Sequence, residues 1–448
     1  MKNKLTGKLN IISLGCSKNL VDSEVMGGGI CARGMTIVEN PRDADVVIVN
    51  TCGFIQPAKE EAIEVILTMA EEKKKRPLKL IVAGCLAQRY AKSLLTEIPE
   101  VDLFVGVGEV GRITDHLQGL TAAKPRRKAL ISKPDFLMTS QHERILSSNS
   151  VTTYLKISDG CSNCCTYCAI PSIRGKARSR KPDDILIEAQ SLIRRGVKEI
   201  ILIGQDTTAY GRDLKARPKL SNLLGDLAAL PGLSWLRLLY AHPAHITADV
   251  LEAMASHPNI CRYLDLPIQH IDNTILTAMN RKVTAARISE ILTEARSILP
   301  DVALRTSIIV GFPGETENRF ERLLDFVRRA RFDHLGVFTY SCEEGTKAFD
   351  LPSRISEKEK ERRRDAVLSE QADISHSINA TLIGSMQDVL IEEPSERKGY
   401  AFVGRSRRQA PEIDGVTYIK DKNVKIGDIV TCKITSADHY DLYGKQLK

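Results

Sequence analysis

Three cysteines stand close together in the segment DGCSNCCTYC. Cys161, Cys165 and Cys168 form the pattern C-x-x-x-C-x-x-C, directly after a strand-like run, TTYLKIS. Random placement of eleven cysteines in 448 residues rarely produces this spacing, so the pattern indicates ligands of a metal or an iron–sulfur cluster. Zinc is the alternative, although zinc sites usually have a fourth Cys or His nearby. Cys164 adjoins Cys165, and adjacent cysteines do not easily both reach one cluster, so we interpret Cys164 as a bystander.

Three thiolates can bind three irons of a cubane cluster, which leaves its fourth iron without a protein ligand. Such an open iron can chelate the amino and carboxylate groups of S-adenosylmethionine, and electron transfer from the cluster then cleaves this cofactor to a 5′-deoxyadenosyl radical. The protein must hold cofactor and substrate together and exclude water. The segment therefore predicts a redox-active 4Fe–4S cluster.

A second set, Cys16, Cys52 and Cys85, is spread over the first part of the chain. Each cysteine directly follows a strand-like run, respectively IISLG, VIVNT and LIVAG. The carboxyl ends of parallel strands meet at one edge of a doubly wound sheet, where ligands bind. A single cysteine is more often a buried core residue. The shared position instead predicts that all three bind a second 4Fe–4S cluster.

The elements that position these cysteines indicate an α/β fold. Over residues 8–118, strand-like runs alternate with helix-like stretches, which predicts a doubly wound parallel domain. One helix is expected over PAKEEAIEVILTMAEEKKK, with proline at its start and lysines at its end. Residues 119–150 lack sustained periodicity and are predicted to be a linker that includes a hairpin.

Residues 151–350 repeat a strand and a helix six times, which predicts a partial (β/α)6 barrel, open on one side to a large substrate. The expected strands are TTYLKIS, KEIILIG, SWLRLLY, YLDLPI, ALRTSIIVG and LGVFTYS. A connecting helix follows within 351–380, and a capping box from Ser356 to Glu359 marks its start. We interpret its many charges as a solvated face.

Residues 381–448 contain short strand-like runs separated by glycine-containing turns, which predicts a small all-β barrel of the nucleic-acid-binding kind. This part has eleven Lys and Arg against ten Asp and Glu. A polyanion-binding domain normally has a basic face, so the balanced charge favours a protein surface as partner over RNA.

Composition excludes several classes of protein. Hydrophobic residues make up 43% and charged residues 27%, as in ordinary globular proteins, which excludes disordered, collagen-like and membrane proteins. No apolar run approaches the ~18 residues that cross a bilayer, and the amino terminus resembles no export signal. We therefore expect a cytoplasmic protein without a membrane partner, in which thiols stay reduced. The net charge of +8 permits an acidic or nucleic-acid partner without requiring one.

The cysteine segment, set on six strand–helix units, resembles the radical-SAM superfamily. In such enzymes the ends of the second and fifth barrel strands, here LIGQDTTAYG and TSIIVGFPGETE, surround the cofactor. The resemblance implies S-adenosylmethionine contacts at Tyr167, Gly204, Gln205, Arg305 and Gly311. The alternative for each is ordinary turn chemistry at a strand end.

Both cysteine sets together resemble the methylthiotransferase family. Its members combine an amino-terminal auxiliary-cluster domain, a radical-SAM barrel and a carboxy-terminal TRAM domain. The resemblance covers nearly the whole chain and implies two 4Fe–4S clusters. The auxiliary cluster supplies or carries sulfur, one S-adenosylmethionine methylates it, and a second generates the radical. A reductant of flavodoxin or ferredoxin type is also implied.

Three segments resemble the RimO-type branch, which modifies an aspartate of small-subunit ribosomal protein twelve: SLGCSKNLVDSE, IPSIRG and GRSRRQAPEIDG. The alternatives are a tRNA adenosine methylthiotransferase of the same architecture and a non-catalytic iron–sulfur or RNA-binding protein. Two residues depart from the family pattern: Cys164, where relatives more often have a basic or polar residue, and Cys342, where proline is usual.

The β-carbon hydrogen of an aspartate is unactivated, so no general base in a protein could remove it at neutral pH, whereas a carbon radical can abstract it. No Ser-His-Asp set, Walker loop or H-E-x-x-H pair competes for the active site. His242, His245 and His270 lie near strand ends but receive no role, because a lone histidine is more often structural. Catalytic residues beyond the cluster ligands are not assigned.

Overall fold

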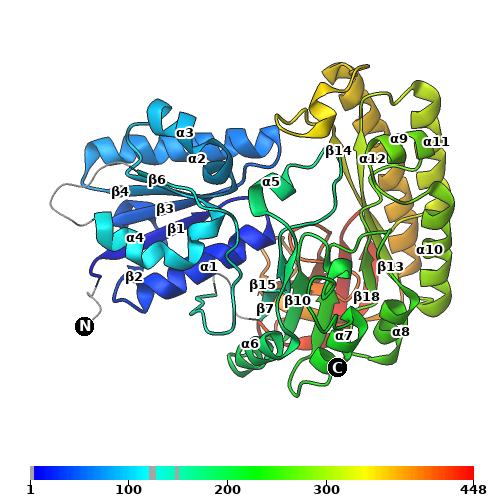
Figure 1. Cartoon of the computed structure of the whole chain (residues 1–448). Coiled ribbons are helices and arrows are strands. Elements are labelled where there is room, and N and C mark those ends of the chain that lie inside the picture. The colour runs from blue at the N-terminus through cyan, green and yellow to red at the C-terminus, as the bar shows by residue number, and fades with distance from the viewer. Residues whose placement is uncertain (1–4, 121–127, 147–150, 448) are drawn as a thin grey trace.

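The computed structural model describes residues 5–120, 128–146 and 151–447. Figure 1 shows an amino-terminal α/β domain (blue to cyan) beside a half-open barrel (green to yellow), with a small β-barrel (orange to red) against the latter. Among the described helices, none is both long enough and apolar enough to cross a membrane.

The amino-terminal domain is a parallel sheet with the order β2-β1-β3-β4-β5-β6. Its strands are β1 (Lys8–Ser13), β2 (Thr36–Ile37), β3 (Val46–Thr51), β4 (Lys79–Gly84), β5 (Leu103–Val105) and β6 (Lys128–Leu130). Strand β3 reads VVIVNT and is buried throughout, as expected for a strand covered on both faces. Helices α1 (Ser17–Cys31) and α4 (Ile113–Leu120) pack on one face, and α2 (Gln56–Lys75) and α3 (Cys85–Glu97) pack on the other.

The segment expected to be a linker with a hairpin differs from that expectation. Strand β6 lies within it and pairs in parallel with β5, as the edge of the amino-terminal sheet. Three residues, KAL, are too short to give a strand pattern in the sequence. Parts of the expected linker, 121–127 and 147–150, lie outside the described residues.

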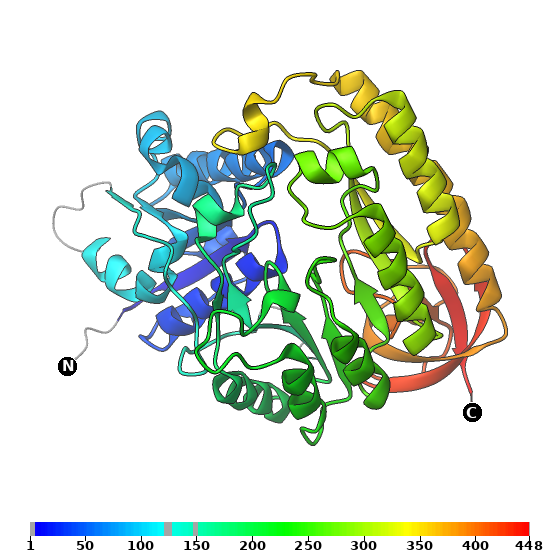
Figure 2. The same ribbon diagram turned by 45° about the vertical axis from the view of Figure 1, so that its right-hand side comes forward.

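The central barrel consists of two parallel three-stranded sheets, β11-β10-β7 and β12-β13-β14, joined by a bridge between Leu236 and Ile260. The strands are β7 (Thr152–Lys156), β10 (Glu199–Ile203), β11 (Trp235–Leu238), β12 (Tyr263–Asp265), β13 (Ala303–Val310) and β14 (His334–Thr339). The longer helices between and after them are α6 (Pro182–Arg194), α7 (Leu220–Ala228), α8 (Ala248–Ser256), α9 (Asn273–Ala278), α10 (Ala285–Ile298), α11 (Glu317–Ala330) and α12 (Glu357–Thr381). Figure 2 shows α10, α11 and α12 side by side along the outer wall.

Helix α12 is the expected connecting helix, and its capping box is present, since the Ser356 hydroxyl accepts a hydrogen bond from the Glu359 amide. The carboxy-terminal strands then close into a barrel with the order β15-β16-β17-β19-β18. They are β15 (Met386–Pro394), β16 (Phe402–Ser406), β17 (Thr417–Ile419), β18 (Ile429–Ala437) and β19 (Leu442–Gln446).

The segment from Arg405 to Asp414 closes the central barrel at the amino ends of its strands. The Arg405 guanidinium pairs with Glu199, the first residue of β10. The hydroxyl of Tyr263, the first residue of β12, donates to Asp414 at 2.6 Å. The floor of the barrel is therefore built by the carboxy-terminal domain, which leaves the carboxyl ends of the strands for the site.

Candidate active site

The loop that contains Cys161, Cys165 and Cys168 lies between the short strand β8 (Ser158–Asp159) and helix α5 (Ile170–Arg174). Its start is fixed because the Cys161 amide donates to the Gly175 carbonyl oxygen at 3.0 Å. The Cys168 amide donates to the Cys165 carbonyl oxygen at 3.1 Å, so the loop turns back on itself between these two ligand candidates.

Burial suppresses ionisation of this triad. It raises the pKa of Cys161 to about 11 and that of Cys168 to about 12, and the neighbouring Cys165 adds to both shifts. Metal binding must therefore displace protons from these thiols. The guanidinium of Arg281 lies 3.6 Å from Cys165 Sγ and 3.4 Å from the Tyr167 hydroxyl. It places positive charge beside this thiol.

The second triad lies at the carboxyl ends of three neighbouring strands, as its sequence positions predict. Cys16 precedes α1, Cys52 follows β3, and Cys85 begins α3. Gly15 allows the first two loops to approach, because a Cβ there would lie 2.6 Å from Cys52 Cβ. Gly53 likewise allows the loop after Cys52 to approach the start of α3, because an added Cβ at Gly53 would lie 2.9 Å from the carbonyl carbon of Cys85.

The three thiols of this triad influence one another's ionisation. Burial, together with the charges of Cys85 and Cys16, raises the pKa of Cys52 to about 12. Burial also acts on Cys16, but the positive charges of Lys18 and Arg174 outweigh it and lower the pKa of this thiol. Cys16 is thus the member of the triad that ionises most readily.

As placed, the sulfurs of neither triad lie as close together as a single zinc ion would hold them. Tetrahedral zinc with Zn–S distances of ~2.3 Å holds its sulfurs only about 3.8 Å apart. In the described part of the chain, only Asp206, His242 and His245 bring three possible metal-ligand atoms within 4.8 Å of one another. Each cysteine triad is therefore wider than a zinc site, although its thiols interact. A cluster of several irons, each of which takes one cysteine, does not require the three sulfurs to lie that close together.

Helix α5 brings the two triads together. It begins two residues after Cys168, and Cys85 of the other triad is buried against its N-cap residue Ala169 and its residue Ile173. Next to Cys16, the Ser17 hydroxyl lies 3.3 Å from the hydroxyl of Tyr240, and the Lys18 ammonium lies 3.0 Å above the same ring. Tyr240 follows barrel strand β11, so the auxiliary edge of the sheet faces the barrel mouth.

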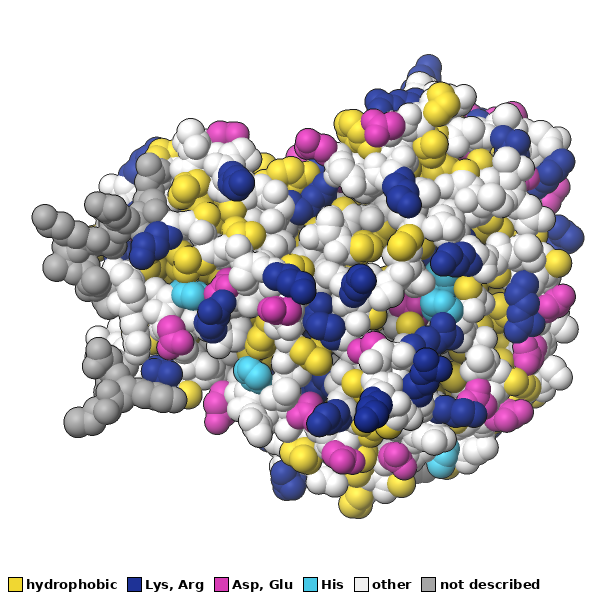
Figure 3. Space-filling view, in the orientation of Figure 1, with side chains coloured by type: hydrophobic (Ala, Val, Ile, Leu, Met, Phe, Trp, Pro, Cys, Tyr) yellow, Lys and Arg dark blue, Asp and Glu magenta, His cyan; other side chains and the backbone are white. Residues whose placement is uncertain are grey.

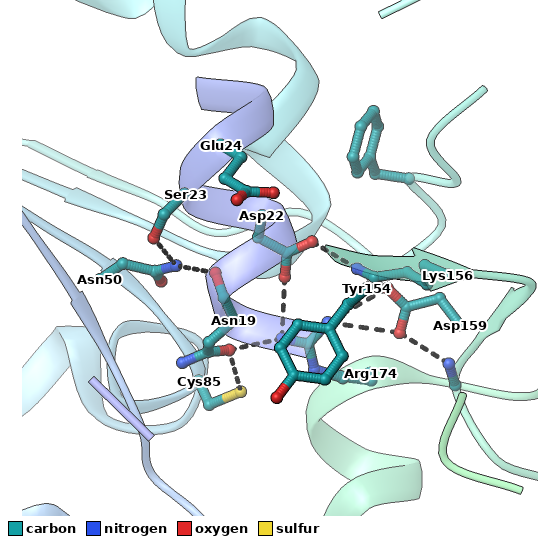
Figure 4. A network of polar contacts seen from close by, with 12 residues as sticks. Asn19, Asp22, Ser23, Glu24, Asn50, Cys85, Tyr154, Lys156, Asp159 and Arg174 are labelled. Carbon is teal, nitrogen blue, oxygen red and sulfur yellow. Dashed lines mark hydrogen bonds and ion pairs between the residues drawn. The ribbon is translucent and has the colours of Figure 1, made fainter. Parts of the chain in front are cut away.

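A buried polar network joins the two domains behind the triads (Figure 4). The Lys156 ammonium pairs with Asp22 of α1 and, at 3.0 Å, with Asp159 of β8. The Arg174 guanidinium pairs with the same two carboxylates at 2.9 and 3.1 Å. Two cations thus balance two carboxylates across the domain boundary.

Four of the five expected S-adenosylmethionine contacts lie around the cysteine loop. Gly204 packs so closely on Ser158 that a Cβ would lie 2.6 Å from its hydroxyl oxygen. Gln205 donates to Asp159 at 3.0 Å, and its buried Oε1 has no partner among the described residues. Tyr167 packs in the hydrophobic cluster that contains Phe312, the residue after Gly311.

Arg305 lies elsewhere, on the floor of the barrel. It is the third residue of β13, and its guanidinium pairs with Asp265 at 3.0 Å and with Asp414 at 3.4 Å. The structure therefore does not bring Arg305 together with the other four residues. Its position near a strand's start, rather than its end, is the reason.

Three polar residues beside the cysteine loop received no role from the sequence. Asp206 accepts hydrogen bonds from His245 Nδ1 at 2.6 Å and from Asn163 of the loop at 2.7 Å. The ring of His242 lies 4.9 Å from that of His245, and burial lowers its pKa to about 3. In the sequence, only the position of Asp206 directly after Gly204 and Gln205 points to a role for these three residues at the site.

Family models divide the chain as the fold does. The match to Uncharacterized protein family UPF0004 covers residues 8–106, that to the Radical SAM superfamily covers 155–327, and that to the TRAM domain covers 383–447.

Solved structures share the fold at low sequence identity. The radical S-adenosylmethionine methyltransferase TsrM from Kitasatospora setae, with cobalamin and a 4Fe–4S cluster bound, has a TM-score of 0.55 at 13% identity and covers 86% of this chain and 81% of its own. The cobalamin-dependent radical enzyme OxsB has a TM-score of 0.52 at 11% identity, over 82% of this chain and 56% of its own.

Curated relatives named ribosomal protein uS12 methylthiotransferase RimO match nearly the whole chain. The protein from Syntrophus aciditrophicus is 52% identical over 98% of both chains, and that from Geobacter sulfurreducens is 48% identical over 98% of both. The protein from Clostridioides difficile is 47% identical over 98% of this chain and 99% of its own. With this identity over its full length, the chain belongs to the RimO family of radical-SAM methylthiotransferases.

Proposed function

We propose that this chain transfers a methylthio group to the β-carbon of an aspartate in ribosomal protein uS12, with S-adenosylmethionine and two 4Fe–4S clusters as cofactors. The substrate follows the relatives' names, and the cofactors follow the superfamily. The observation that carries the proposal is that one short helix, α5, adjoins both cysteine triads. Sulfur bound at one triad and a radical formed at the other would then meet over one substrate carbon.

We assign Cys161, Cys165 and Cys168 to the radical-SAM cluster and Cys16, Cys52 and Cys85 to the auxiliary cluster. When bound, the cofactors supply a carbon-centred radical for hydrogen abstraction together with the sulfur and the methyl group. The chain's own residues position these groups. Arg281 places positive charge beside Cys165, and the Gln205 side chain leaves Oε1 free for a donor such as the amino group of S-adenosylmethionine.

The exposed surface is consistent with a protein substrate. Figure 3 shows both Lys and Arg and Asp and Glu side chains over the face that it draws. A flavodoxin- or ferredoxin-type protein would supply the electrons in the cytoplasm.

The test is anaerobic reconstitution, followed by reaction with uS12 in small ribosomal subunits. We expect about eight irons per chain, release of 5′-deoxyadenosine, and a uS12 peptide heavier by one methylthio group. A parallel reaction with transfer RNA in place of the ribosomal subunits serves as the control. Thiomethylation of tRNA with unmodified uS12 would replace this proposal with the tRNA activity, and absence of 5′-deoxyadenosine would leave a non-catalytic protein.

A further inference from the structure

Arg174 is the last residue of α5, and only 2% of its surface is exposed. Its helix starts beside Cys168 of one triad, while its guanidinium reaches the first turns of α1 beside the other. A buried arginine is costly unless every charge is matched, so its partners indicate what it does.

The two ends of this guanidinium bind different domains. Nη1 donates to Asp159 of the barrel, at 3.1 Å to Oδ2 and 3.3 Å to Oδ1. Nη2 donates to two residues of α1, Asn19 at 2.6 Å and Asp22 at 2.9 Å. Such a fork fixes geometry as well as charge, which the single ammonium of a lysine does not.

These contacts extend toward both proposed cofactor sites. On one side, the Cys85 thiol lies 3.7 Å from the Asn19 oxygen that also accepts from Arg174. On the other side, Asp159 accepts from Gln205 at 3.0 Å. A continuous series of polar contacts therefore runs from an auxiliary-cluster thiol through Arg174 to a residue at the S-adenosylmethionine site.

The groups that lie near each positive charge distinguish Arg174 from Lys156, the other cation of the network. Among the residues that the structure describes, the Lys156 ammonium pairs only with Asp22 and Asp159. Arg174 in addition lies beside a thiol: its Nη2 donates to the Asn19 oxygen at 2.6 Å, and the Cys85 thiol lies 3.7 Å from that same oxygen. Because the carboxylates are already balanced by two cations, any thiolate at Cys16 or Cys85 adds negative charge that Arg174 is placed to offset.

We propose that Arg174 is a positioning residue for the auxiliary cluster. Its charge raises the reduction potential of that cluster, and its two-sided fork holds the ligands of the cluster in register with the barrel. The inference rests on the proposed function only in assigning a cluster to Cys16, Cys52 and Cys85.

The test uses full-length protein in which Cys161, Cys165 and Cys168 are changed to alanine, so that only the auxiliary cluster assembles. Arg174→Gln removes the charge but retains one amide donor, whereas Arg174→Lys retains the charge but loses the fork. An electron added near a cation is stabilised, so R174Q should lower the midpoint potential in an EPR-monitored titration. We expect at least a tenfold change in the reduction equilibrium, about 59 mV for one electron, while R174K stays near the parent value.

Lys156→Met is the matched control, because it disturbs the same two carboxylates without removing charge beside the thiols. It should lower thermal stability with a smaller change in potential. Loading of iron in R174K but not in R174Q would equally support the role of the charge. Equal potentials in R174Q and the parent would overturn the role of the charge, and iron loading of R174K equal to that of the parent would overturn the role of the fork. Absence of iron from the parent would instead refute the auxiliary cluster itself.

Discussion

Gly15→Ala is the substitution whose effect the structure predicts most directly. Gly15 precedes Cys16 and has a φ of 87°, in the left-handed region. A side chain in this region costs about 1–2 kcal/mol. The new Cβ would also lie 2.6 Å from Cys52 Cβ and 3.2 Å from its Sγ. Overpacking of this kind costs about 1–3 kcal/mol, so the combined loss of unfolding free energy is about 2–5 kcal/mol.

The same displacement affects cluster binding, because Cys52 must move to make room. Its backbone has little freedom, since it follows the fully buried strand β3, in which Thr51 Oγ1 donates to the Ala83 carbonyl oxygen at 2.6 Å. We therefore expect the auxiliary cluster to be lost and the radical-SAM cluster to remain. Iron analysis after anaerobic reconstitution should fall from about eight to about four atoms per chain.

Gly119→Ala is the control, because Gly119 lies in helix α4 with no heavy atom within 4 Å of the added Cβ. Alanine is the better helix former by about 1 kcal/mol, so this variant should be slightly more stable and retain all its iron. Full iron content and unchanged stability in Gly15→Ala would refute the close approach of Gly15 and Cys52 on which the auxiliary site depends.

Three further outcomes follow from the site. Cys85→Ala should leave about four irons per chain, whereas Cys164→Ala should leave about eight, because Cys164 is exposed and forms no part of either triad. In the metal-free protein, alkylation followed by peptide mapping should label Cys16 at lower pH than Cys52, whose pKa is raised to about 12 by burial; preferential labelling of Cys52 would contradict the charge arrangement. Burial lowers the pKa of His242 to about 3, so the folded protein binds fewer protons than the unfolded chain between pH ~6.5 and 3. The free energy of unfolding should fall through this window as pH decreases, by up to about 1.4 kcal/mol per pH unit from this group. Chemical denaturation at several pH values should show that the free energy of unfolding of His242→Gln depends less steeply on pH than that of the parent. An unchanged pH dependence would exclude this titration.

The motif GRSRRQAPEIDG illustrates how a sequence resemblance and a structural role can differ. The resemblance places it in the RimO-type branch, and the charge balance of its domain favours a protein partner. In the structure, its residues close the barrel floor: Arg405 pairs with Glu199, and the Arg408 carbonyl oxygen accepts from His334 at 2.8 Å. These contacts join the carboxy-terminal domain to strands β10 and β14 of the central barrel.

The sequence determined both cysteine triads and the order of the domains. Cys161, Cys165 and Cys168 could be grouped because they lie in one short segment whose spacing is typical of cluster ligands. Cys16, Cys52 and Cys85 could be grouped because parallel strands place their carboxyl ends on one edge. Both inferences need only local periodicity and a general rule of sheet topology.

The tertiary structure alone decided which charged residues serve the site. Arg174 meets Asn19 across 155 positions of sequence, and Asp206 meets His245 across 39. Arg305, near the start of β13, lies on the barrel floor, where Asp414 from another domain binds it. Spacing in sequence carries no information about such partners, since a buried charge is placed by whichever opposite charge the packing of distant elements brings within reach.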